Sequence, residues 1–266
     1  MSKYIKQQAD SLSETRFRKT NKRQPDMCKT DSRKAYEPER KQMRVIFDEE
    51  MKQVADDLKS MTGYIEKAIV LAGKALLEND IESAQQLIDN DSIIDGLEVS
   101  IIDRCVVVLA KQNPVATDLR VVVSSMRLAS TFERMGDLAR HIGETARRSY
   151  PNSAITNELK DIFVQMQAFT ADVAGRLSDI LEEHDTAVAK QIIDNDSKLN
   201  ALHNSVFALV TGDEWTGTRQ QVIDTVLLSR FYERFGDHAV FVARKLIYIV
   251  SGFDPAMDPG NDDDND

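Results

Sequence analysis

Two segments with the same pattern, Glu-Arg-x-Gly-Asp, contain the residues of this chain that could do chemistry. They are Glu133-Arg134-Met135-Gly136-Asp137 and Glu233-Arg234-Phe235-Gly236-Asp237. Both lie inside long helical patterns, so each Glu and its Asp share one helix face, about one turn apart. Like charges at this spacing destabilise an isolated helix by about 0.2–0.5 kcal/mol. Because the chain has this unfavourable pair twice, we expect a cation to sit between the carboxylates.

Further acidic residues face each segment if the flanking helices pair as antiparallel hairpins. Asp91 lies 22 residues before a turn centred near Asn113, and the middle of the first segment lies 22 residues after it. Asp91, and Asp95 one turn along, are therefore expected opposite the first carboxylate pair. The same arithmetic puts Asp196 and Asn200 opposite the second pair. Because an amide replaces one carboxylate there, we expect any preferential metal binding at the first site.

Carboxylate ligands without Cys or His favour hard or intermediate cations, such as Mg²⁺, Mn²⁺, Ca²⁺ or iron. Di-iron oxygenase bundles need a Glu-x-x-His pattern, and none of the four histidines stands three residues after a Glu. Oxygen chemistry is therefore not expected. The sequence predicts a divalent metal ion (Mg, Mn or Fe), with these candidate ligands: Glu133, Asp137, Glu233, Asp237, Asp91, Asp95 and Asp196.

A metal-free interpretation of the same residues stays open. Both segments could form solvated acidic faces that Arg134 and Arg234 partly neutralise. An Asp137–His141 pair would add to this in the first half. Duplication and the facing acidic residues favour the metal interpretation over this one.

The elements that must position these residues are helices. Apolar residues recur every three to four positions from Met43 to about Val250, which predicts amphipathic helices. Asp80 is suited to cap the second helix, and Gly212 to end the fifth in a left-handed conformation. Five breaks divide the pattern into six helices: Asn79-Asp80, Asn113-Pro114, Tyr150–Ser153, His184-Asp185 and Thr211-Gly212.

The two halves of this pattern arise by internal duplication. Ile88-Asp89-Asn90-Asp91-Ser92 recurs letter for letter 105 residues later, whereas the Glu-Arg-x-Gly-Asp segments are 100 residues apart. The second hairpin is therefore about five residues shorter. We predict an all-α fold of two tandem antiparallel three-helix bundles. The predicted divisions are a disordered basic arm (1–42), the first bundle (43–150), the second bundle (151–253) and a disordered acidic tail (254–266).

Charge and composition exclude several classes of protein. Residues 1–42 contain 12 Lys/Arg and 6 Asp/Glu, a net charge of +6, and the remaining residues contain 22 and 38, a net charge of −16. So acidic a body is not expected to bind nucleic acid through phosphate contacts. With no run of 18 apolar residues and two cysteines, the chain is expected to be cytoplasmic and free of disulfides.

The chain resembles the PhoU family of bacterial phosphate-signalling regulators over about residues 44–250. Pro114-Val115-Ala116-Thr117-Asp118-Leu119-Arg120 is similar to the family's P-x-A-x-D-L-R, and Arg127 matches a basic position. Both Glu-Arg-x-Gly-Asp segments match its E/D-x-x-x-D motifs. The chain departs from the family pattern at Ile102 and Asn200, where relatives can carry a carboxylate.

The resemblance implies two three-helix bundles with divalent metals, sometimes multinuclear iron clusters, at the E/D-x-x-x-D positions. It also implies a negative regulator of phosphate uptake and of the phosphate-starvation response. Such a regulator would bridge the ATP-binding subunit of a phosphate ABC transporter and a phosphate-sensing histidine kinase. We further expect a homodimer, with at most peripheral contact with a membrane.

Two other functions compete with this non-enzymatic regulator. One is a metal-free helical scaffold or adaptor. The other is a carboxylate-metal enzyme, which would need an open coordination position and a positioned base. The sequence identifies neither of these, so we do not expect catalysis.

Overall fold

The computed structural model describes residues 32–183 and 185–252. The chain divides into two units, residues 1–42 and residues 43–266. The described part of the first unit is the start of helix α2 (Ser32–Leu77), which therefore begins before the expected Met43. Once a helix has nucleated, it extends through polar sequence at little cost per residue. The predicted disorder of residues 1–31, and of the acidic tail at 254–266, lies outside the described residues and stays a prediction.

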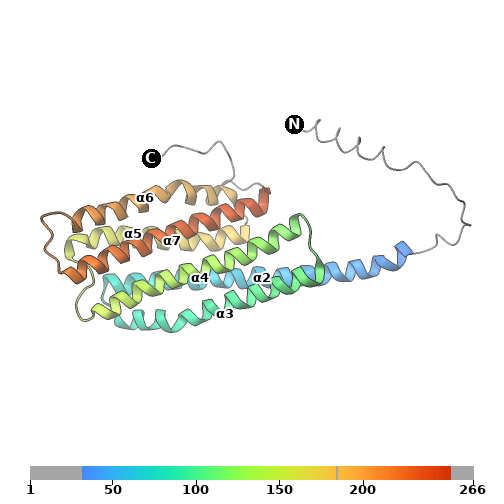
Figure 1. The fold of residues 1–266 in the computed structure, drawn as a ribbon, viewed down its shortest axis with the longest axis horizontal. Coiled ribbons are helices and arrows are strands. Elements are labelled where there is room, and N and C mark those ends of the chain that lie inside the picture. Colours follow the sequence, from blue (N-terminus) through green and yellow to red (C-terminus); the bar gives the residue numbers. More distant parts are fainter. Residues whose placement is uncertain (1–31, 184, 253–266) are drawn as a thin grey trace, which may run out of the picture. The chain divides into compact units, whose positions relative to one another are not determined.

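The first bundle consists of α2, α3 (Ile81–Gln112) and α4 (Thr117–Ser149). Helix α3 begins where the sequence predicts, because the Asp80 carboxylate accepts hydrogen bonds from two backbone amides of the first turn, at 3.0 and 3.1 Å. Such a cap satisfies amides that have no partner within the helix. Figure 1 shows α3 and α4 running side by side as a hairpin.

The second bundle repeats this arrangement. Asp185 caps its middle helix as Asp80 caps α3, with bonds of 2.7 and 3.2 Å to backbone amides. Residues 32–183 and 185–252 contain helices and no strand, so the predicted all-α fold of two duplicated bundles is confirmed. No helix within these ranges is long and apolar enough to cross a membrane. The second bundle consists of α5 (Lys160–Glu183), α6 (Thr186–Val210) and α7 (Arg219–Ser251), and the short 3₁₀ helix η1 (Asn157–Leu159) precedes it.

The two hairpins differ at their tips. Helix α3 has 32 residues and α6 has 25, and Val115 at the first tip is 74% exposed. The predicted left-handed cap at Gly212 is wrong. Thr211 ends α6 in a right-handed conformation, and its N–H bonds back to carbonyls of the last turn. Within the described residues, the glycine with positive φ (76°) is Gly252, at the end of α7.

Helices α4 and α7 pack against each other and join the two bundles into one unit. A buried polar relay adds a second connection. The hydroxyl of the fully buried Tyr232 on α7 donates to Oε1 of Gln167 on α5 at 2.8 Å, and Gln167 Nε2 donates to the Ile69 carbonyl of α2 at 2.8 Å. A Cβ on Gly73 of α2 would lie 2.3 Å from Cδ of Gln167. Glycine is therefore needed there for the relay to form.

The relay predicts the effect of removing one hydroxyl. Tyr232→Phe leaves the buried Oε1 of Gln167 without its donor and should lower the free energy of unfolding by about 1–3 kcal/mol. Urea unfolding followed by circular dichroism measures this. In a Gln167→Met background, the same substitution should cost less than half as much, because no acceptor is then left unpaired. An equal cost in both backgrounds would show that the hydrogen bond is not the cause.

Candidate functional site

The first Glu-Arg-x-Gly-Asp segment lies in the middle of α4, on the side that packs against α3. Gly136 lets the two helices approach, since a Cβ there would lie 2.8 Å from Cδ1 of Ile94 on α3. Across this contact, the charge of Asp137 acts on Asp91, as the hairpin arithmetic predicts. We call Asp91, Asp95, Glu133 and Asp137 the first cluster.

An arginine that the sequence analysis missed lies between the carboxylates of the first cluster. Nε of Arg140 lies 2.6 Å from Asp91 Oδ2, and Nη2 lies 2.8 Å from Asp137 Oδ1. Its Nη1 donates to Glu144 Oε1 at 2.6 Å. Burial opposes the guanidinium charge, but these carboxylates outweigh it and raise the pKa of Arg140. Arg140 therefore stays charged and joins α3 to α4.

The remaining charges of the first cluster are less well balanced. Burial is the main reason that the pKa of Glu133 is raised, and Asp137 adds to the effect while Arg134 opposes it. Burial also raises the pKa of Asp91, where Arg140 acts in the opposite direction. A carboxylate that loses water without gaining a full partner favours its neutral form. The Glu133 carboxylate therefore lacks a full counter-charge, and a cation beside it would stabilise its charged form.

The second Glu-Arg-x-Gly-Asp segment faces α6 in the same way. A Cβ on Gly236 would lie 2.6 Å from Cδ2 of Leu199 and 3.4 Å from Oδ1 of Asp196. The Asp196 side chain therefore reaches α7 between the two acidic positions of the segment, Glu233 and Asp237. We call Asp196, Glu233 and Asp237 the second cluster.

The second cluster contains a buried oxygen without a partner. Glu233 is 9% exposed, its Oε1 accepts from Arg230 Nη1 at 2.5 Å, and its Oε2 makes no hydrogen bond. Asp196 Oδ2 accepts from Asn200 Nδ2 at 3.2 Å. Burial, with Asp237 adding to it, raises the pKa of both Asp196 and Glu233. An unpartnered oxygen in such surroundings is costly unless a donor or a cation reaches it.

The sequence therefore located the clusters but not all of their members. The expected Asp137–His141 pair does not form. His141 Nδ1 lies 3.2 Å from Glu144, whereas Asp137 is held by Arg140 and by Arg134 at 3.7 Å. Arg140 could have been expected beside Asp137, because it stands three residues later and residues at this spacing share one face of a helix. Glu98 stands three residues after Asp95, a spacing that places both on one helix face. It accepts from Ser130 Oγ at 2.7 Å, and its charge raises the pKa of Glu133.

The seven predicted metal ligands fall into these two clusters. In the part of the chain that the structure describes, no three His, Cys, Asp or Glu side chains are arranged to hold a metal ion together. Asp95 is exposed and reaches the first cluster only through its charge. Metal binding by these residues stays a prediction, and the oxygen of Glu233 without a partner is the observation that fits it best.

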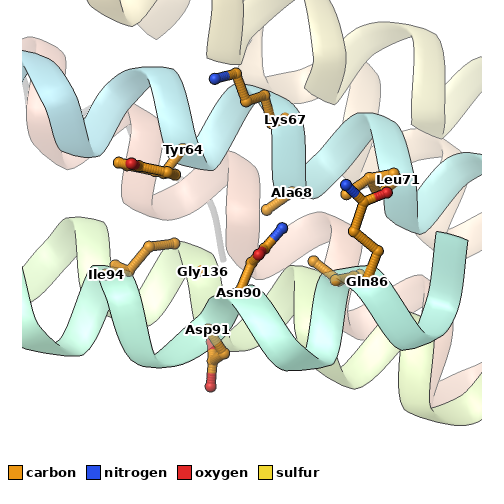
Figure 2. A pocket seen from close by; sticks show the side chains of 10 residues that line it. Tyr64, Lys67, Ala68, Leu71, Gln86, Asn90, Asp91, Ile94 and Gly136 are labelled. Atoms are coloured by element: carbon orange, nitrogen blue, oxygen red, sulfur yellow. The ribbon is translucent and has the colours of Figure 1, made fainter.

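A cavity of about 200 Å³ lies between α2 and α3, and its lining includes Asp91 of the first cluster and the neighbouring Gly136. In Figure 2, Asn90 and Gln86 of α3 point into the gap toward α2, whereas Asp91 points away from it. Sites for drug-sized ligands usually enclose about 300–1,000 Å³. The cavity is therefore smaller than a typical site for a drug-sized ligand.

The residues that resemble P-x-A-x-D-L-R tie the start of α4 to its neighbours. Asp118 accepts from Arg44 Nη1 of α2 at 2.7 Å. Arg120 Nη2 donates to the Ile249 carbonyl near the end of α7 at 3.1 Å, and the Arg120 guanidinium stacks over the Tyr248 ring. The Asp118 contact lies within the first bundle, and the Arg120 contacts connect the first bundle to the second at the α4–α7 boundary.

The fold and the two clusters define a class of protein: a duplicated three-helix bundle with a glycine-centred carboxylate pair on the last helix of each half. The family model of the PhoU domain matches residues 58–146 and 163–246. The chain belongs to the PhoU family.

Individual relatives agree with this membership. The chain is 35% identical over 213 residues to "Phosphate-specific transport system accessory protein PhoU homolog 2" of Mycobacterium tuberculosis, covering 80% of this chain and all of the relative. It is 33% identical over 221 residues to "PhoU homolog 1" of Mycobacterium leprae, covering 82% and 100%. The crystal structure of PhoU from Pseudomonas aeruginosa matches with a TM-score of 0.71 and 25% identity, covering 78% and 100%.

The raised pKa of Glu233 predicts a pH-dependent effect on stability in the presence of a chelator. A group whose pKa is raised by folding binds its proton more tightly in the folded state, so its contribution is lost as pH rises through the folded pKa. Glu233→Gln should therefore melt about 2–4 °C above wild type near pH 8, the shift that about 1 kcal/mol produces in a chain of this size. The difference should shrink toward pH 4.5.

Calorimetry in EDTA measures both melting temperatures. Asp194→Asn, which removes an exposed carboxylate from α6, is the control and should show no such trend. If the melting temperature of Glu233→Gln rose further above that of wild type as the pH fell, the result would contradict a raised pKa for Glu233.

Proposed function

We propose that the chain is a negative regulator of phosphate uptake and of the phosphate-starvation response. It would act by contact with the ATP-binding subunit of a phosphate ABC transporter and with a phosphate-sensing histidine kinase. Membership of the PhoU family supports this role, because relatives at 33–35% identity are named as accessory proteins of phosphate-specific transport. Contact with a transporter ATPase would place its action on the cytoplasmic side of the membrane.

The observation that carries the proposal is the duplicated carboxylate cluster. Each half places a Glu and an Asp of its last helix opposite an acidic residue of its middle helix, and four of these carboxylates have pKa values raised by burial. A divalent Mg, Mn or Fe ion, when bound, would supply the missing positive charge. The side chains that would hold it are Asp91, Asp95, Glu133 and Asp137, or Asp196, Glu233 and Asp237.

Charge connects these clusters to partner binding. The body from residue 43 onward carries a net charge of −16, so it attracts basic partner surfaces and repels acidic ones. Neutralising a cluster changes the local charge along one hairpin and fixes its two helices together. Such a change alters a binding surface without requiring a catalysed reaction, and we propose none.

A metal-free scaffold is the second candidate function. The pairing of Arg140 with three carboxylates favours it, because an internal cation already stabilises the first bundle. The homodimer expected from the sequence stays a prediction under either function.

Loss of the gene should uncouple phosphate uptake from phosphate supply. In phosphate-rich medium, a deletion strain should take up labelled phosphate at the rate of starved cells, and a plasmid copy of the wild-type gene should restore repression. A copy with Glu133, Asp137, Glu233 and Asp237 all changed to their amides should restore it less, provided that immunoblots show equal protein. Unchanged uptake in the deletion strain would overturn the regulatory role.

Partner contact should be detectable directly. Tagged full-length protein purified from phosphate-replete cells should co-purify with the transporter ATPase or the histidine kinase, and mass spectrometry identifies either one. Arg44→Ala/Asp118→Ala, which removes one exposed ion pair between α2 and α4, is a control for non-specific loss. Recovery of neither partner from crosslinked cells would contradict the contact mechanism.

A further inference from the structure

A cleft larger than the cavity between α2 and α3 lies where α4 ends and α7 begins. Its volume is about 690 Å³, within the range of about 300–1,000 Å³ that is usual for small-molecule sites. Residues between Ser149 and Glu158, in the segment that links the two bundles, form one wall. Residues between Thr216 and Asp224, in the loop before α7 and its first turns, form the other (Figure 1). A molecule in this cleft would therefore contact both bundles.

A buried carboxylate lines the cleft. Asp224 of α7 is only 1% exposed. Its Oδ1 atom accepts from Arg148 Nη2 at 2.5 Å and from Gln220 Nε2 at 2.9 Å. Both donors share this one oxygen, and among the described residues no donor reaches Oδ2. One oxygen of a buried charged group therefore lacks a partner, which is costly unless a donor or a cation reaches it from the cleft.

The rest of the lining is polar and carries no positive charge. Most of its side chains are Ser, Thr, Asn and Gln, and among the described residues that line the cleft there is no Lys, Arg or His. Glu158, at the exposed rim, accepts from Thr216 Oγ1 at 3.2 Å through its Oε1 atom. The Thr156 hydroxyl is buried without a hydrogen-bond partner. This lining repels phosphate and other anions, and it attracts a cation that carries N–H donors.

The duplicated frame shows that helix packing does not require the Asp224 charge. The equivalent position in the first half, 100 residues earlier, is Ser124, which is also buried. The wall of the cleft depends on a close approach at Gly217. A Cβ there would lie 2.3 Å from Cζ2 of Trp215 and 2.9 Å from Cγ2 of Thr156. The loop before α7 is thus packed against the segment that links the bundles, with a carboxylate beneath it that the other half lacks.

We propose that this cleft binds a small organic cation with ammonium groups, of the diamine or polyamine class. One ammonium group contacts the free Oδ2 atom of Asp224 in the interior, and a second lies near Glu158 at the rim. Hydroxyl and amide oxygens of the lining accept the remaining N–H bonds. The proposal depends neither on metal binding by the two clusters nor on the regulatory role.

Titration calorimetry of the full-length protein tests the proposal. The probe is putrescine (1,4-diaminobutane). One control is 1,4-butanediol, which has the same chain without the charges, and the other is inorganic phosphate. Wild type should bind one putrescine and bind both controls at least about tenfold more weakly. Asp224→Asn should weaken putrescine binding by at least about tenfold. Glu214→Gln, which removes an exposed carboxylate of the same loop outside the lining, should not change it.

A variant that leaves the charge unchanged covers the case in which Asp224→Asn does not fold. Asn152 is an exposed residue of the lining, and Asn152→Trp should abolish putrescine binding by filling the cleft. Circular dichroism checks the fold of each variant. If neither folded variant weakened binding, or if Glu214→Gln weakened it equally, putrescine would be binding to the acidic surface in general and the proposal would be wrong. No binding by wild type, or tighter binding of phosphate than of putrescine, would also overturn it.

Discussion

The close contact of paired helices at Gly136 and Gly236 determines where every carboxylate of the two clusters lies. At each glycine, an aliphatic side chain of the facing helix, Ile94 or Leu199, fills the space that a Cβ would take. Both aliphatic residues are buried, and full burial of such a side chain contributes about 1.5–3 kcal/mol. This apolar contact offsets the repulsion of the carboxylates on either side of the glycine. It also removes water from Glu133 and Glu233, which is why the pKa values of these two carboxyls rise.

The two halves respond differently to the same desolvated charges. In the first, Arg140 supplies a counter-charge from within the chain, so ion pairs hold the α3–α4 hairpin together. In the second, Glu233 Oε2 is buried without a hydrogen-bond partner, and the ion pair of Glu233 is to Arg230 on the same helix. Within one unit, a hairpin bridged by an arginine is therefore joined to a hairpin whose buried carboxylate is only partly paired. The α4–α7 packing and the Gln167 relay connect them.

Apolar periodicity and chain breaks were enough to predict the helices, their pairing and the duplication, because these depend on local rules of spacing and capping. The level of Asp91 against Asp137 followed from counting residues along a hairpin. Counting gives only the height of a residue along the helix axis. It cannot show which long side chain reaches across, and so it missed Arg140. The Gln167 relay was equally hidden, since its partners are more than sixty residues apart in sequence.

The unequal length of the two hairpins has a consequence for recognition. An internal duplication gives a molecule approximate twofold symmetry, and a perfectly symmetric surface would let a partner dock in two equivalent orientations. Helix α3 is longer than α6, and the tip of its hairpin exposes Val115. The tip of the other hairpin is the longer segment between Val210 and Arg219, so the two ends of the duplicated frame differ in shape. A partner that contacts one tip would therefore not fit the other in the same way.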